Sequence, residues 1–409
     1  MSSSPLILGF VPLLDCATVV AAHELGFARA EGLELTLVRE NSWANIRDRV
    51  IVGHFDAAHM LGPMAVASGL GISHMTVPMI AAMSLGLGGN AITVSKALWR
   101  DMAAHGATLG ATAAVQGEAL CNAIRARAAR GLAPLTFAMV YPFSAHNYEL
   151  RYWLAACGID PDVDVRLTVI PPPFLVDALR EGQVDGFCVG APWSSLAVEA
   201  GVGTIVLPTT AIWRLSPEKV LGCRADWAQT HTAELAALIR ATTRAAAWCD
   251  DANNHAELAK LLAEPRYVGV SADILQRTLA GTLRLSPESD ATRVSDYLCF
   301  ARHGANFPWK SHALWFYSQM VRWKQVEPSK ERADIARSTF RPDIYRDAVR
   351  SLGIDVPLAD AKIERTTEAI TDAKGEVVFG AEGFFDGKVF DPENVDDYVG
   401  EAAQQLNET

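Results

Sequence analysis

His146 stands where an amphipathic helix is expected to begin, in the stretch YPFSAHNYELRYWLAACG at residues 141–158. Apolar side chains recur at helical spacing from Leu150 onward, which predicts a helix. Either Ser144 or Asn147 can serve as its N-cap. Because a helix N-terminus presents unpaired N–H groups and a partial positive charge, His146 is placed to help hold an anion. The alternative is a polar helix terminus that faces water.

No familiar catalytic motif accompanies this histidine. The chain has no G-x-S-x-G elbow, no phosphate-binding glycine loop followed by Lys-Ser/Thr and no C-x-x-C pair. Asp185, Glu181 and Cys188 could act as acid, base or nucleophile near a strand end, but no activating motif surrounds them. His54 and His59 are five residues apart and flank a predicted strand, so we expect no zinc site there. These patterns favour a binding protein over an enzyme, with no cofactor and no metal.

Length and charge limit the classes of function. A chain of 409 residues exceeds the usual size of one domain, so two or more lobes are expected. Its net charge of -11 argues against direct contact with nucleic acid, and means that local groups must attract any anionic ligand. No uninterrupted apolar run reaches the ~18 residues of a membrane span. The N-terminus has no basic leader region, and the seven cysteines, an odd number, fit a reducing compartment, so we expect a cytoplasmic protein.

The elements that must position these residues alternate between strand and helix over the first 230 residues. The pattern predicts strands at 6–10, 33–38, 55–61, 91–95, 107–112, 135–140, 164–170, 184–190 and 203–208, and helices at 16–29, 42–53 and 117–130. Such alternation is typical of an α/β fold with parallel or mixed sheets that helices cover on both faces. The later chain is expected to be mostly helical, with a polar, irregular tail from about residue 361.

Six stretches of the sequence resemble one known family in both content and order. They are SWANIRD, DAAHMLGPM, GNAITVS, HNYELRYWLAACGIDPD, PPPFLVDALREGQVDGFCVGAPW and SPEKVL. Together they resemble the nitrate- and bicarbonate-binding periplasmic binding-protein family, continuously to about residue 230 and more weakly through WFYSQMVRW. The resemblance implies a two-lobed α/β fold, type 2-like, with crossovers near Gly89–Asn90 and Val189–Gly190. The implied division is 1–88 and 190–409 for lobe 1, including a mostly helical C-terminal part, and 89–189 for lobe 2.

The resemblance also implies a ligand site. Nitrate-binding members hold their ligand with a tryptophan, a glutamine, a histidine, a backbone glycine region and a lysine. The matching positions in this sequence are Trp43, Asn90, His146, Val189, Gly190 and Lys219. Asn90 departs from the family pattern, since its amide is one methylene shorter. These residue types suit nitrate, a flat monoanion with no proton, because Lys219 supplies a positive charge and the other residues supply hydrogen-bond donors. Trp43, His146 and Gly190 are expected beside three helix N-termini.

Each of these residues also has a purely structural explanation. Trp43 could be a core residue, Asn90 a turn residue and Lys219 a solvated surface lysine. Gly190 could simply relieve crowding at a strand end. The ligand could also be bicarbonate, whose hydroxyl group needs an acceptor such as Glu218 or the carbonyl of Asn90.

Within the family, the chain resembles the cytoplasmic nitrate/nitrite sensors of the NasS type, because the first strand begins almost at the N-terminus. That resemblance implies a regulatory partner, an RNA-binding antiterminator of the ANTAR class (NasT type), which the sensor restrains until ligand arrives. The expected role is therefore control of nitrate assimilation, with no direct contact to nucleic acid or membrane. The alternative role is the substrate-binding component of an ABC-type nitrate or bicarbonate transporter.

Overall fold

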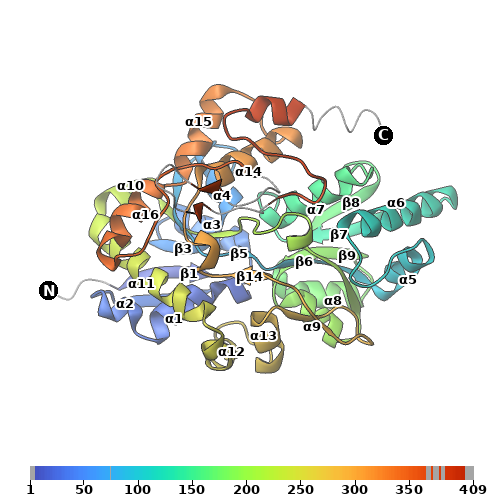
Figure 1. Ribbon diagram of the computed structural model, residues 1–409, viewed down its shortest axis with the longest axis horizontal. Helices are drawn as coiled ribbons and strands as arrows, with labels where there is room; N and C mark the ends of the chain where they lie inside the picture. Colours follow the sequence, from blue (N-terminus) through green and yellow to red (C-terminus); the bar gives the residue numbers. More distant parts are fainter. Residues whose placement is uncertain (1–4, 74, 365–369, 372–376, 379–382, 401–409) are drawn as a thin grey trace.

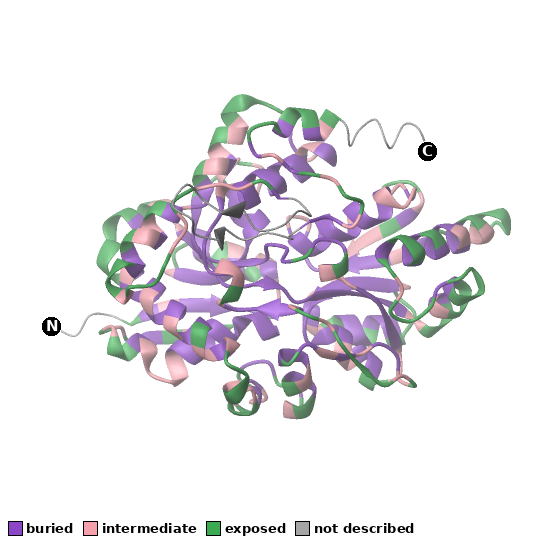
Figure 2. Ribbon diagram, viewed as in Figure 1, coloured by how far each residue is buried: buried purple, intermediate pink, exposed green. Residues whose placement is uncertain are grey.

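Two α/β units lie side by side in the computed structural model, each built around a five-stranded sheet (Figure 1). The structure describes residues 5–73, 75–364, 370–371, 377–378 and 383–400. The strands of both sheets are largely buried, whereas the outward faces of the helices are exposed (Figure 2). This is the α/β architecture that the alternating pattern of the sequence predicts.

The first sheet has the strand order β2-β1-β3-β11-β4. Its strands are β1 (Leu6–Phe10), β2 (Leu35–Arg39), β3 (Ala57–Leu61), β4 (Met79–Ser84) and β11 (Lys219–Arg224). Its helices include α1 (Ala17–Glu24), α2 (Phe27–Ala30), α3 (Trp43–Ile51), α4 (Gly62–Gly69) and α10 (Ala225–Thr230). β1 runs parallel to β2 and β3, and β11 runs antiparallel to β3 and β4. The single helix predicted at 16–29 is divided because Gly26 adopts a left-handed conformation with φ of 78°.

The second sheet has the strand order β10-β6-β9-β7-β8. Its strands are β6 (Asn90–Ser95), β7 (Leu135–Met139), β8 (Val165–Val169), β9 (Gly186–Gly190) and β10 (Gly203–Pro208). Its helices are α5 (Lys96–Ala104), α6 (Ala113–Ala129), α7 (Ala145–Ala156), α8 (Leu175–Arg180) and α9 (Trp193–Glu199). The strand predicted at 107–112 is wrong: this segment is a turn, in which Gly110 has a φ of 77° that no strand accommodates.

The chain crosses between the two sheets twice. The first crossover lies where it is predicted, and the second lies later in the sequence than predicted. It leaves the first sheet after β4 and enters the second at β6, through β5 (Leu87–Gly88) and the predicted crossover at Gly89–Asn90. The return does not occur at Val189–Gly190. β10 pairs antiparallel with β6, so residues 190–208 stay with the second sheet. The chain reaches the first sheet again only at β11, after residue 208.

The chain beyond residue 230 is mostly helical, as the sequence predicts. It forms α11 (Thr232–Asp250), α12 (His255–Leu262), α13 (Ala272–Leu279), α14 (Lys310–Arg322), α15 (Lys330–Thr339) and α16 (Pro342–Val349). Three two-stranded ladders involve β12 (Thr282–Arg284) with β13 (Ala291–Arg293), β14 (Leu298–Cys299) with β5, and β15 (Ile370–Thr371) with β16 (Val377–Val378). The predicted irregular tail falls partly outside the described residues. None of the helices that the structure describes has the length and apolarity to cross a bilayer.

Candidate ligand-binding site

A buried cluster of polar side chains lies where the two units meet. The first unit contributes Asp15, Trp43, His59, Glu218 and Lys219, and the second contributes Asn90, His146, Glu149 and Gly190. Every polar or charged side chain among them is at most 6% exposed. The sequence therefore predicts four of the converging side chains (those of Trp43, Asn90, His146 and Lys219) and the glycine. The three carboxylates and His59 complete the set.

Two helix starts position the aromatic donors of the cluster. The hydroxyl of Ser42 accepts a hydrogen bond from the backbone N–H of Asn45 at 3.2 Å, which makes Trp43 the first residue of α3. Ser144 caps α7 in the same way, so His146 is the second residue of that helix. The water-facing alternative for His146 is wrong, because its side chain is fully buried.

Lys219 is the cation at the centre of the cluster. Its Nζ lies 2.8 Å from Oδ2 of Asp15, and it also donates a hydrogen bond to Glu218. The same atom lies 5.6 Å from the centre of the Trp43 ring. Burial alone would lower the pKa of Lys219, but the Asp15 and Glu218 carboxylates outweigh it and raise that pKa above its ordinary value. Lys219 is therefore a buried charged group and not a solvated surface lysine.

Asn90 and Gly190 lie directly opposite each other on β6 and β9. Nδ2 of Asn90 donates to Oε2 of Glu149 at 2.9 Å and also to Glu218. A Cβ atom at Gly190 would lie 3.4 Å from Oδ1 of Asn90, so glycine leaves room for the amide. Val189 precedes Gly190 in the strand, and alternation places its side chain on the opposite face of the sheet from the cluster.

The three carboxylates and His59 are the part of the site that sequence reasoning missed, apart from naming Glu218 as an acceptor. Two signals could have found Glu149 and Asp15. Glu149 lies three residues after His146, which places both on one face of α7. Asp15 lies a few residues beyond the carboxyl end of β1, the edge at which α/β sheets bind ligands.

The three carboxyl groups have different protonation states. Burial and the neighbouring Glu218 carboxylate raise the pKa of Glu149 to about 8. Burial and Asp15 raise the pKa of Glu218, which Lys219 opposes. Burial would also raise the pKa of Asp15, but Lys219 and His59 hold it well below its usual range. At neutral pH, Glu149 therefore keeps its proton and Asp15 is ionised.

Both histidines of the cluster are neutral, since burial lowers the pKa of His59 and of His146. Nδ1 of His59 accepts the backbone N–H of Val11 at 3.5 Å, so its Nε2 carries the proton and donates to Asp15 at 2.8 Å. Nε2 of His146 lies 3.5 Å from Nζ of Lys219, which can only donate. The proton of His146 therefore sits on Nδ1.

Four buried polar atoms of the cluster have no hydrogen-bond partner among the described residues. They are the donors Trp43 Nε1 and His146 Nδ1, the acceptor Asn90 Oδ1, and Oε1 of Glu149. An unpaired buried polar atom costs roughly 1–3 kcal/mol. A small polar ligand that satisfied these atoms would recover that free energy. The arrangement therefore suits binding of a ligand that carries hydrogen-bond acceptors and a negative charge near Lys219.

Comparisons with known proteins identify the family and the fold. Residues 2–263 match the NMT1-like family. The chain is 37% identical over 351 residues to the nitrate import ATP-binding protein NrtC of Synechocystis sp., covering 85% of this chain and 50% of that protein. It is 30% identical over 406 residues to the bicarbonate-binding protein CmpA of Synechococcus sp., covering 96% and 85%. The crystal structure of the periplasmic nitrate-binding protein NrtA from Synechocystis superposes with a TM-score of 0.85 at 27% identity, covering 98% and 99%.

These similarities confirm the predicted resemblance to nitrate- and bicarbonate-binding proteins and the predicted fold. The chain spans about half the length of the NrtC relative. The relatives named here are binding and transport proteins, which is consistent with the expectation of a protein that is not an enzyme. The predicted closeness to NasS-type sensors stays a prediction.

Proposed function

The chain belongs to the NMT1-like family, and we propose that it binds a small trigonal oxyanion, nitrate or nitrite, in the buried cluster between its two units. One observation carries this proposal. Lys219 of the first unit and His146 of the second converge to 3.5 Å, beside the unpaired donor Nε1 of Trp43. A buried cation and unpaired neutral donors are the groups that a desolvated monoanion requires.

The protonated state of Glu149 removes the charge of one of the three carboxyl groups from the cluster. Nitrate has three acceptor oxygens and no proton, so an ionised carboxylate beside it would repel it. Below about pH 8, Glu149 keeps its proton and is neutral. The proton of a neutral carboxyl group can be donated to an oxyanion, as the NH of an amide can. Asp15 and Glu218 remain paired with Lys219 and set the charge that the ligand meets.

Bicarbonate is the second candidate, and a specific observation favours it. Oδ1 of Asn90 is a buried acceptor without a hydrogen-bond partner among the described residues, and the Glu218 carboxylate accepts from Nδ2 of the same amide. The hydroxyl group of bicarbonate can donate to such an acceptor, whereas nitrate cannot. The similarity to CmpA, which is named as a bicarbonate-binding protein, supports the same candidate.

We propose a transport role for the binding protein, as the substrate-binding part of an ABC-type import system. The names of the relatives, a nitrate import protein and bicarbonate- and nitrate-binding proteins, support this role more than the regulatory one. The sensor that acts on a NasT-type antiterminator in the cytoplasm is the alternative. The seven cysteines, all of them free, support that alternative because they suit a reducing compartment.

Calorimetric titration of the purified protein with nitrate, nitrite and bicarbonate, with sulfate as a control, tests the ligand. Micromolar or tighter binding of nitrate or nitrite, and none of sulfate, would support the main proposal. Binding of bicarbonate alone would replace it with the second candidate. No binding of any of the three would refute both.

Affinity capture from the native host distinguishes the two roles. If the protein is a transport component, capture in detergent should recover permease and ATPase subunits with it. No RNA-binding protein is expected among the recovered proteins. Recovery of an ANTAR-class protein that nitrate releases would favour the sensor instead. The ligand affinity must then fall by the same factor when that partner is bound, because coupling between two sites is reciprocal.

A further inference from the structure

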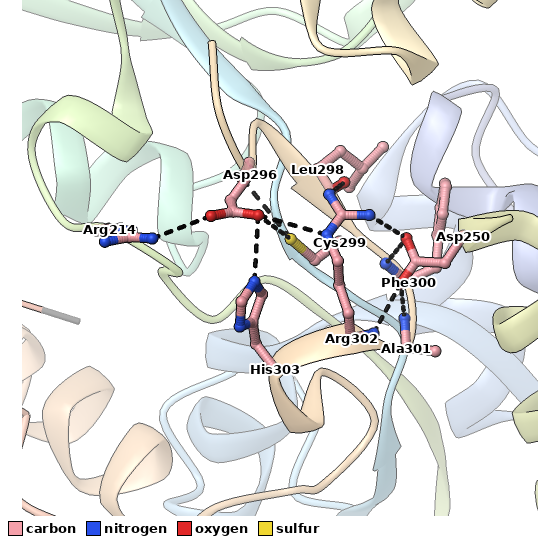
Figure 3. Close-up of polar contacts among 9 residues, drawn as sticks. All are labelled: Arg214, Asp250, Asp296, Leu298, Cys299, Phe300, Ala301, Arg302 and His303. Atoms are coloured by element: carbon pink, nitrogen blue, oxygen red, sulfur yellow. Dashed lines mark hydrogen bonds and ion pairs between the residues drawn. The ribbon is translucent and has the colours of Figure 1, made fainter. Parts of the chain in front are cut away.

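A second cluster of chemically active side chains lies outside the oxyanion site, in the segment between α13 and α14. It contains Asp296, Cys299 and His303, whose ligand atoms all lie within 4.8 Å of one another. Cys299 is buried, and the other two are partly exposed. Figure 3 shows the Asp296 carboxylate between Arg214 on one side and the Cys299 thiol on the other, with His303 approaching the same carboxylate oxygen.

The carboxylate of Asp296 is oriented as a metal ligand would be. Its Oδ2 pairs with Nη2 of Arg214 at 3.1 Å, so Oδ1 faces the other two groups. Oδ1 lies 3.1 Å from Nε2 of His303 and 4.0 Å from Sγ of Cys299. Hydrogen bonding of the second oxygen is how proteins usually fix a ligating carboxylate.

The nearby Arg302 is held mainly by groups outside the cluster. Its Nε lies 3.4 Å from Oδ1 of Asp296, which is a weak contact. Its stronger bonds run from Nη1 to Asp250 at 2.7 Å and from Nη2 to the carbonyl of Leu298 at 2.9 Å. Asp250 also accepts the backbone N–H groups that follow Cys299 and so holds this turn in place.

The backbone of the cluster is anchored independently of any ion. β14, which contains Cys299, pairs with β5, so that Cys299 lies opposite Leu87. A Cβ atom at Gly86 would lie 2.9 Å from the carbonyl oxygen of Cys299, which shows how closely the two segments approach. A surface cavity of about 590 Å³, lined by Arg214, Asp296 and Arg302 among others, gives solvent access to Asp296.

We propose that Asp296, Cys299 and His303 form a site for Zn²⁺ or a related transition-metal ion. A thiol, an imidazole and a carboxylate are the ligand types that zinc prefers, with bonds of ~2.0–2.3 Å. Tetrahedral bonds of that length place ligand atoms ~3.3–3.8 Å apart, so only small side-chain movements are needed from the present geometry. The fourth position would be filled by water. The spacing D-x2-C-x3-H is local and unlike the common zinc patterns, so sequence analysis alone predicts no metal here.

The site also has a structural consequence, because the backbone between Asp296 and Cys299 contacts the crossover between the units. Gly89, the residue before Asn90, donates its N–H to the carbonyl of Tyr297, which neighbours Asp296. Gly88 pairs with Leu298. An ion on the three ligands would therefore fix the strand against which the first crossover packs.

The test uses metal-free full-length protein titrated with Zn²⁺ against a chromophoric chelator. Binding is expected at one site, and His303→Ala and Cys299→Ser should each weaken it tenfold or more. Cys157→Ser is the matched control, since Cys157 is partly exposed and lies far away in the sequence on a different unit; it should leave zinc binding unchanged. Co²⁺ gives a second readout, a near-ultraviolet thiolate band that Cys299→Ser abolishes.

Two results would overturn the proposal: no zinc binding by the wild-type protein, or zinc binding that survives both substitutions. Since Cys299 is buried, its variant could fail to fold, and circular dichroism checks that outcome. His303→Ala keeps the test decisive in that case, because His303 is partly exposed and its side chain is not part of the core. Oxyanion binding measured on the metal-free protein is independent of the outcome.

Discussion

Nζ of Lys219, on the first sheet, lies 3.5 Å from Nε2 of His146, on a helix of the second unit. Both side chains are fully buried, so this contact exists only when the two units are together. It fixes the tautomer of His146, because an ammonium group cannot accept a hydrogen bond. The N–H of Nδ1 is consequently left to donate; it has no hydrogen-bond partner among the described residues, and Oε1 of Glu218 lies 3.9 Å from it.

The first prediction is that Lys219→Ala and His146→Ala each weaken oxyanion binding tenfold or more, since losing a charge-assisted or buried hydrogen bond costs roughly 1.5–3 kcal/mol. Calorimetric titration measures the change. Lys96→Ala is the matched control, because Lys96 forms only an exposed pair with Glu288 and should not affect binding. Wild-type affinity in the Lys219 variant would refute the site.

The second prediction separates a ligand donor from a packing residue. Trp43→Phe removes Nε1 but keeps an aromatic ring near His59 and Lys219. If Nε1 binds the ligand, affinity should fall by roughly three- to tenfold, the value of one net hydrogen bond, with a small loss of stability. Titration and urea unfolding on the same sample measure both. Unchanged affinity would show that Trp43 is a packing residue of the core and does not bind the ligand through Nε1.

The sequence predicts much of the fold because local patterns dictate it. The strands at 6–10 and 203–208 coincide with β1 and β10, and Ser42 caps its helix as expected. Pairing between distant segments is not encoded in this way. The second crossover was misplaced because β10 joins the second sheet through antiparallel pairing with β6, which no local pattern reveals. The contacts of Asp15 with Lys219 and of Glu149 with Asn90 likewise depend on the tertiary fold, although the helix spacing of Glu149 and the strand-end position of Asp15 are visible in the sequence.

The third prediction concerns Asn90→Gln. The family pattern alone would make this change mild, because it restores the usual residue. In the structure Asn90 is fully buried and its amide nitrogen already donates to Glu149 and to Glu218. An added methylene must displace one of these bonds, and we expect a loss of about 1–3 kcal/mol in unfolding free energy. Urea unfolding measures it, and an unchanged midpoint would contradict the tight packing described for Asn90.

The fourth prediction is a pH dependence of stability that arises from Glu149. Burial and Glu218 raise its pKa in the folded state to about 8, against an ordinary value of 4.5. The folded state therefore holds this proton more tightly than the unfolded chain. Its contribution to stability is complete below about pH 4.5 and is lost as the pH rises to about 8.

Glu149→Gln mimics the protonated group and should remove this part of the pH dependence. The test compares unfolding free energies of the wild type and the variant near pH 5 and near pH 8, at fixed ionic strength. The variant should gain stability relative to the wild type at the higher pH. His59 and His146 titrate in both proteins and cancel in the comparison. Parallel pH profiles would show that Glu149 is ionised throughout.

The last prediction tests whether closing of the two units contributes to affinity. Ligand can reach the buried cluster only if the units separate, so binding competes with an open form. Arg47 of α3 donates to the hydroxyl of Tyr141, in the second unit, at 2.7 Å, and its side chain is 12% exposed. Because this contact is made outside the ligand cluster and joins the two units, it stabilises the closed form alone.

Arg47→Ala should therefore lower ligand affinity by roughly three- to tenfold without changing which oxyanion is preferred, because one hydrogen bond to a charged group is lost only from the closed state. Tyr141→Phe removes the same hydrogen bond but keeps the ring beneath the guanidinium, and should give a smaller loss. Small-angle scattering should show a larger radius of gyration for ligand-free Arg47→Ala than for the wild type. Equal affinities and equal radii in all three proteins would mean that the units do not separate about this contact.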